Sequence, residues 1–74
     1  MADLYTELSQ AVARREVQRG RRIMREKGLD PDEALQEADE TLREARELSS
    51  ADPWRHLMTD EALALKAAAE SALY

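Results

Sequence analysis

Two short stretches with the same order of residues, GLDPDEA and SADPWRH, constrain the fold of this 74-residue chain more than any other feature. In each, the Asp side chain can accept hydrogen bonds from the free N–H groups at a helix start, and the Pro that follows has a preset φ and no N–H to leave unpaired. Both stretches therefore predict helix starts, at residues 30–31 and 52–53. Glu33 stands three residues after Asp30 and completes a capping box, and Gly28 is placed to end the preceding helix.

The composition agrees with an all-helical chain. Hydrophobic residues make up 43% of the sequence, and most of them are Ala and Leu, which enter helices easily, whereas β-branched residues are scarce. We predict a single all-α domain, a small three-helix bundle with helices over about residues 3–27, 31–48 and 53–73. Thr59 is expected to re-cap the third helix after a first turn. A domain of this size has a thin core and often gains stability by oligomerisation.

The apolar positions predict how the first two helices pack. Ala and Leu recur at three- and four-residue spacing along 31–48, and Gly20 and Met24 share one face of 3–27. We predict that these helices form an antiparallel hairpin about Leu29, in which Gly20 meets Ala38. A glycine inside a helix costs roughly 1 kcal/mol relative to alanine. Close packing against a small facing residue would explain why Gly20 stands at this position. In this register Gly20→Leu is far more destabilising than Gly20→Ala.

Two apolar surfaces exceed what this hairpin can bury. The start of the first helix overhangs the second one, and the Ala-rich segment ALALKAAAESALY is apolar around most of its circumference. Such a helix lies either in the middle of a three-helix bundle or also at an interface. We therefore predict a homo-oligomer, with self-association through Leu4, Tyr5, Leu8, Leu65 and Leu73.

Charge is distributed unevenly along the chain. Residues 14–27 hold seven Lys or Arg and two Glu, a net charge of +5, whereas 28–50 carry −6 and the whole chain carries −5. One interpretation is that the two segments neutralise each other across the hairpin. That pairing places Arg21 and Arg25 beside Asp32 and Asp39, and Arg19 and Lys27 beside Glu33, Glu37 and Glu40. It leaves several arginines over, and the candidate partner-binding residues are Arg14, Arg15, Arg22 and Arg25.

The surplus arginines suggest two classes of partner. Guanidinium groups pair bidentately with carboxylates and are enriched in interface hot spots, which favours an acidic protein surface. The alternative is a nucleic-acid-associated regulator that uses 14–27 to contact phosphates. The negative net charge, the lack of interleaved aromatic residues and the lack of a helix-turn-helix module oppose it. Trp54 is either a lid on the core or an exposed anchor for a partner, and we include it among the partner-binding candidates.

Catalytic and membrane functions find little support in the sequence. There is no nucleophile motif, phosphate-binding loop or metal-ligand cluster, and His56, the single His, is expected to be a surface or interhelical hydrogen-bonding residue. We predict no enzyme activity, no cofactor and no membrane span, and a cytoplasmic protein, in the host cytoplasm if it is phage-encoded. The favoured function is a small protein-binding module: an adaptor, an inhibitor or an assembly subunit of a larger bacterial or phage complex.

Overall fold

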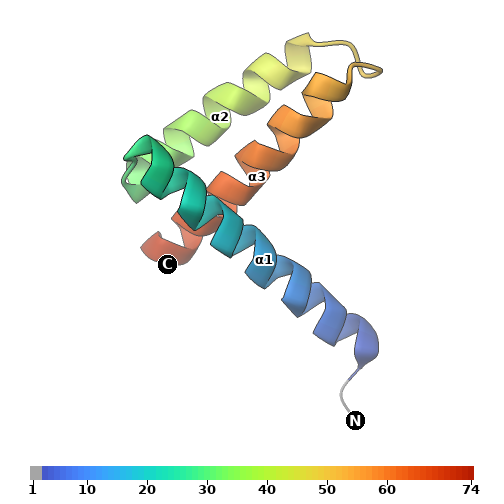
Figure 1. Cartoon of the computed structure of the whole chain (residues 1–74), viewed down its shortest axis with the longest axis vertical. Coiled ribbons are helices and arrows are strands. Elements are labelled where there is room, and N and C mark those ends of the chain that lie inside the picture. Colours follow the sequence, from blue (N-terminus) through green and yellow to red (C-terminus); the bar gives the residue numbers. More distant parts are fainter. Residues whose placement is uncertain (1–2) are drawn as a thin grey trace.

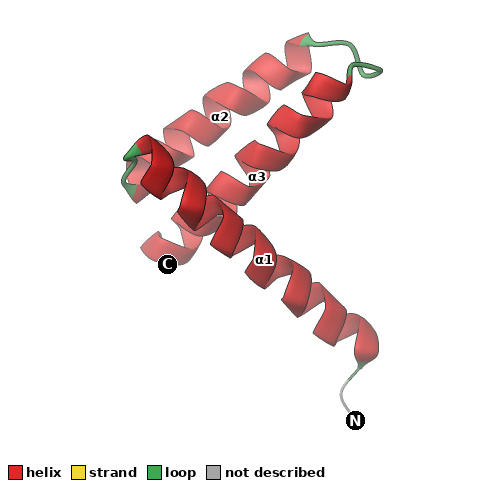
Figure 2. Cartoon of the chain, viewed as in Figure 1, coloured by secondary structure: helices red, strands yellow, loops and turns green. Residues whose placement is uncertain are grey.

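The computed structural model of the chain describes residues 3–74, which form three helices joined by short loops (Figures 1 and 2). Helix α1 spans Leu4–Lys27, α2 spans Pro31–Glu47 and α3 spans Pro53–Leu73. The predicted all-α class is confirmed, and the helix bounds agree with the predicted ones to within one residue.

The helix boundaries follow from the predicted capping residues. Gly28 ends α1 in the left-handed conformation, with φ 65°, and the backbone N–H of Leu29 donates to the Met24 carbonyl oxygen at 2.9 Å. The capping box of α2 is present: the Glu33 N–H donates to Asp30 Oδ1 at 2.8 Å, and the Asp30 N–H donates to Glu33 Oε1 at 3.3 Å. The three-residue turn between α1 and α2 is thus held from both sides.

Removing this cap gives a first test. We expect Asp30→Ala to lower the free energy of unfolding by about 1 kcal/mol, because the free N–H groups at the α2 N-terminus lose their side-chain acceptor. Asp32→Ala is the matched control, since Asp32 is exposed in the same first turn but does not cap the helix. Chemical denaturation followed by circular dichroism measures both, and equal losses for the two variants would contradict the role of the cap.

The third helix begins in the same way, without the predicted re-capping by Thr59. Asp52 accepts a hydrogen bond from the Trp54 N–H at 2.9 Å, and Pro53 is the first helical residue. The helix then continues through residue 59, where the Thr59 hydroxyl donates to the Arg55 carbonyl oxygen at 2.8 Å. That prediction is wrong because the hydroxyl bonds back to the preceding turn of an unbroken helix.

The hairpin is formed by α2 and α3, and α1 lies across α3 (Figure 1). Helix α1 makes only minor contact with α2, so the predicted pairing of the first two helices is wrong. Gly20 is buried, but it packs on Ala64 and Ala68 of α3 and not on Ala38. The Ala-rich helix is therefore the middle element of the three, one of the two positions predicted for it.

The core is built almost wholly from alanine. One cluster joins α2 and α3, and Leu65 is its only large buried side chain. Ile23 and Met24, near the end of α1, pack against this cluster as partly buried residues. Small side chains let the helix backbones approach closely, but they bury little apolar area per residue. The cluster consists of Ala34, Ala38, Ala62, Leu65 and Ala69.

Because α1 crosses α3, its first half extends beyond the other two helices (Figure 1). Residues 4–16, which we call the arm, are all exposed, and Val17 is the first partly buried residue of α1. The Cα radius of gyration is 13.6 Å, whereas a compact domain of this length would have about 11 Å. The crossing thus produces an open molecule that presents much of α1 to solvent.

Candidate protein-docking surface

Most of the arginines in residues 14–27 lie on the side of α1 that faces away from α3. Gly20 marks the side that packs on α3, and each helical residue turns by about 100°, so Gln18 and Arg22 lie about 160° from it on the opposite side. We call this surface the basic face. It comprises Arg14, Arg15, Gln18, Arg22 and Arg25 on that side and, at its two edges about 100° from Gly20, Arg19 and Arg21; all of them are exposed.

The acidic residues of α2 do not neutralise the basic face. In the part of the chain that the structure describes, one ion pair joins α1 to α2, between Lys27 Nζ and Glu37 Oε1 at 3.4 Å. On the basic face itself, Arg22 has a partner within its own helix, Glu26, at 4.0 Å. The predicted pairing across a hairpin is therefore correct for Lys27 and Glu37 and wrong for Arg19, Arg21 and Arg25. The cause is that α2 packs against α3 and leaves α1 to cross elsewhere.

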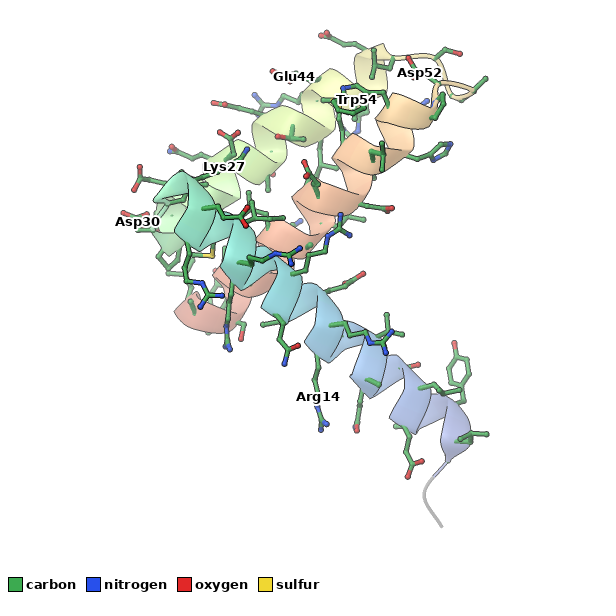
Figure 3. All side chains as sticks on the ribbon, in the orientation of Figure 1. Arg14, Lys27, Asp30, Glu44, Asp52 and Trp54 are labelled. Atoms are coloured by element: carbon green, nitrogen blue, oxygen red, sulfur yellow. The ribbon has the colours of Figure 1, made fainter. Side chains whose placement is uncertain are left out.

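The four predicted partner-binding arginines fall into two neighbouring shallow hollows. Arg15, Arg22 and Arg25 line one hollow of about 310 Å³ together with Gln18 and Arg19. Arg14 lines the next hollow, which also includes Arg21 and, from the end of α3, Ser71. Gln18 lines both, so the two hollows form one continuous surface. Figure 3 shows Arg14 extending from α1 away from the α2–α3 hairpin.

Two members of this surface, Arg19 and Arg21, are absent from the predicted partner-binding residues. The predicted hairpin places residues 31–48 beside the first helix, so both arginines were expected to pair with carboxylates there. Their position relative to Gly20 is the signal that would have found them, once the partner of Gly20 is known to be α3. The basic face is therefore broader than four arginines.

Trp54 is an exposed side chain and not a lid on the core. It is 61% exposed at the start of α3 (Figure 3). It borders a hollow of about 120 Å³ with Leu57, Met58 and Glu61 of α3 and Arg19 of α1. The interpretation of Trp54 as a core lid is wrong, because α1 crosses α3 nearer its C-terminus and leaves this end uncovered. Arg19 belongs both to this hollow and to the basic face.

The residues predicted for self-association separate into exposed and buried ones. Leu4, Tyr5 and Leu8 are exposed on the arm, where they form an apolar stripe with Val12. Leu73 is also exposed, near the end of α3. Leu65 is 3% exposed and packs inside the chain, where the α2–α3 hairpin covers it. Its prediction as a self-association residue is therefore wrong.

The exposed side chains of the basic face are hydrogen-bond donors that can bind an anionic group. Guanidinium forks can donate paired hydrogen bonds to carboxylates or phosphates. His56 is exposed on α3, and within residues 3–74 no cluster of three or more His, Asp or Glu is arranged to hold a metal ion. The described helices also include none that combines the length and apolarity needed to cross a bilayer.

Comparison with known proteins adds no relative. No family model matches the chain, and neither the curated proteins nor the solved structures contain a significant match.

Proposed function

We propose that the chain is a small non-catalytic protein-binding module that docks through its basic face onto an acidic protein surface. The observation that carries this proposal is the position of the basic face, on the side of α1 opposite its contact with α3. Six arginines gathered there without carboxylate neighbours from α2 repel one another, and an acidic partner relieves that repulsion. An adaptor, an inhibitor or an assembly subunit would act in this way.

An acidic protein is favoured over a nucleic acid by what surrounds the basic face. None of the residues on it is aromatic, so unstacked bases find no ring to stack on. The chain as a whole carries −5, and a long polyanion would also meet the exposed carboxylates of α2, such as Glu40 and Glu44. An acidic patch on a folded protein can bind the basic face without also lying over the carboxylates of α2.

Self-association is part of the same proposal. The apolar stripe on the arm and the exposed Leu73 are surfaces that a second copy can bury. The arm also has a physical need for a partner, because most helix stability in proteins comes from tertiary packing, and residues 4–16 are all exposed within the chain. We propose that the module works as a homo-oligomer.

Charge reversal on the basic face tests the docking proposal. We expect Arg15→Glu combined with Arg22→Glu to abolish binding to the physiological partner, found by cross-linking and mass spectrometry and then purified. Both side chains point away from α3, so helicity should not change. The matched control is Arg43→Glu combined with Arg46→Glu on α2, which changes net charge equally on another exposed surface. Isothermal titration calorimetry at two salt concentrations measures both variants, and wild-type binding should weaken as salt increases.

Two results would contradict the docking proposal. Equal loss of binding in the two double variants would mean that only net charge matters. Low-micromolar binding of a duplex or single-stranded oligonucleotide in physiological salt, lost in the α1 double variant alone, would favour the nucleic-acid alternative.

A further inference from the structure

The apolar stripe of the arm faces the notch between the arm and the first half of α3. Leu8 and Val12 precede Arg19 by about three and two helical turns, so all three residues share one face of α1. Arg19 lines the hollow that contains Trp54 and Leu57 of α3. A helix that covers the stripe would therefore lie in this notch.

The uncovered part of α3 continues the surface to which α1 already binds. Leu57 and Glu61 lie two turns before Ala64 and Ala68, the residues on which Gly20 packs. Because α1 crosses α3 and does not run along it, Leu57 remains 52% exposed. The notch thus has apolar side chains on both walls, from the arm and from α3.

The charges along the arm indicate which helix fits the stripe. Along one edge of the stripe the acidic residue, Glu7, comes first and the basic one, Arg14, follows, whereas Glu16 lies on the other edge. Glu7 and Arg14 are seven residues, or two turns, apart and so lie along the same edge of the stripe. An identical helix running in the opposite direction has the complementary order of charges, whereas a parallel one would place Glu7 beside Glu7 and Arg14 beside Arg14.

We propose that the arm binds the arm of a second copy of this chain in antiparallel orientation. This inference rests on the self-association in the proposed function and specifies how it occurs. The two arms are symmetric about a point between Gln10 and Ala11, so Glu7 of each copy faces Arg14 of the other, and the Leu8 and Val12 side chains of the two copies pack together. Leu4 and Tyr5 of each arm then reach toward the Trp54 hollow of the other copy.

Reciprocal charge reversal tests this register. We expect Glu7→Arg alone and Arg14→Glu alone each to weaken homodimerisation about tenfold, because each reversal makes two symmetry-related pairs repulsive. An equimolar mixture of the two variants should form a heterodimer with wild-type affinity, since both pairs are then attractive. Glu7→Arg also removes a favourable charge from the first helical turn, but the mixture contains that variant, so recovered affinity cannot come from helix stability.

The control and the apolar contact are tested in the same series. Sedimentation equilibrium should show that Thr6→Arg, which is exposed on the side of the arm away from both the stripe and the edge with Glu7 and Arg14, leaves the dimer unchanged. Leu8→Asp should abolish the dimer, and Thr6→Asp should not. Circular dichroism should show that no variant loses more helical signal than the arm contributes, because no side chain of the arm belongs to the core.

The possible outcomes distinguish the antiparallel register of the arms from self-association in general. Recovery of affinity in the mixed sample supports the antiparallel register. A dimer that both reversals leave unaffected, or that survives Leu8→Asp, overturns the register although self-association stands. A wild-type monomer at several hundred micromolar overturns both. Neither result decides docking to an acidic partner, which Arg22→Glu alone measures: Arg22 lies beyond the arm, whereas Arg15 follows Leu8 by two helical turns and shares the face of the stripe.

Discussion

Gly20→Ala is expected to loosen the packing of α1 on α3 and to lower the thermal midpoint by up to about 15 °C. A Cβ at residue 20 would lie on the backbone carbonyl oxygen of Ala64 and 2.6 Å from the Ala68 Cβ, and neither atom belongs to a flexible side chain that could move aside. Overpacking of this kind typically costs 1–3 kcal/mol, and one kcal/mol corresponds to about 4–8 °C in a domain of this size. The gain in helix propensity, about 1 kcal/mol, offsets only part of that loss.

This expectation replaces the one drawn from the α1–α2 hairpin, in which alanine at residue 20 was tolerated. Gln18→Ala is the matched control, because Gln18 is exposed on the opposite side of α1 and gains helix propensity without a clash. Its thermal midpoint should stay the same or rise slightly. A Gly20→Ala variant as stable as wild type would contradict the close contact between α1 and α3.

Leu65→Ala is expected to have the largest effect of any single truncation. Loss of a buried leucine side chain costs about 2–5 kcal/mol, whereas the core of so small a domain rarely supplies more than about 3–5 kcal/mol. Within residues 3–74, Leu65 is the one large side chain that is buried, so its neighbours, mostly alanines, have few atoms with which to fill the cavity. We expect a largely unfolded chain, or one that melts below physiological temperature.

Leu63→Ala is the matched control, because it removes the same side chain from an exposed position of the same helix. Leu63 is two residues away and 45% exposed, so the same truncation there should cost less than about 1 kcal/mol. Urea denaturation of the two variants measures the difference. Similar losses at the two positions would indicate that α3 is covered on its outer side, as in an interface with another chain, and not only by α2 and α1.

The helix boundaries could be predicted from the sequence because local chemistry determines them. The caps at Asp30 and Asp52, the prolines after them and Gly28 act within one helical turn, so no knowledge of tertiary contacts is needed. Thr59 is the exception, since its hydroxyl bonds equally well to a carbonyl inside a continuing helix.

The helix pairing could not be predicted because two helices offer similar rows of small residues. Gly20 requires an alanine surface, and Ala34 and Ala38 on α2 provide the same four-residue spacing as Ala64 and Ala68 on α3. Helical periodicity shows which residues share a face but not which helix covers that face. Proximity along the chain favoured α2, yet the short turn lets α1 leave α2 and cross α3.

The predictions about the candidate site were right where they depended on composition and wrong where they depended on the helix pairing. The excess of arginine in residues 14–27 is a property of composition and survives any change of helix pairing. The assignment of Arg19 and Arg21 to intramolecular pairs, and of Leu65 to an interface, depended on the pairing and changed with it. The lid interpretation of Trp54 fails for the same reason, since the crossing leaves the start of α3 open.

Both the basic face and the arm are exposed because α1 crosses α3 and does not pair with α2. Two pairs of introduced cysteines test this crossing directly, since the chain has none of its own: Arg14→Cys with Ser71→Cys, and Arg14→Cys with Arg46→Cys. Arg14 and Ser71 line one hollow, whereas the hairpin of α1 and α2 would bring Arg14 beside Arg46. Spin labels on these cysteines, in protein diluted with unlabelled chain, report the intrachain distances by pulsed electron resonance. We expect the shorter distance for residues 14 and 71, and a shorter distance for residues 14 and 46 would contradict the crossing of α1 over α3.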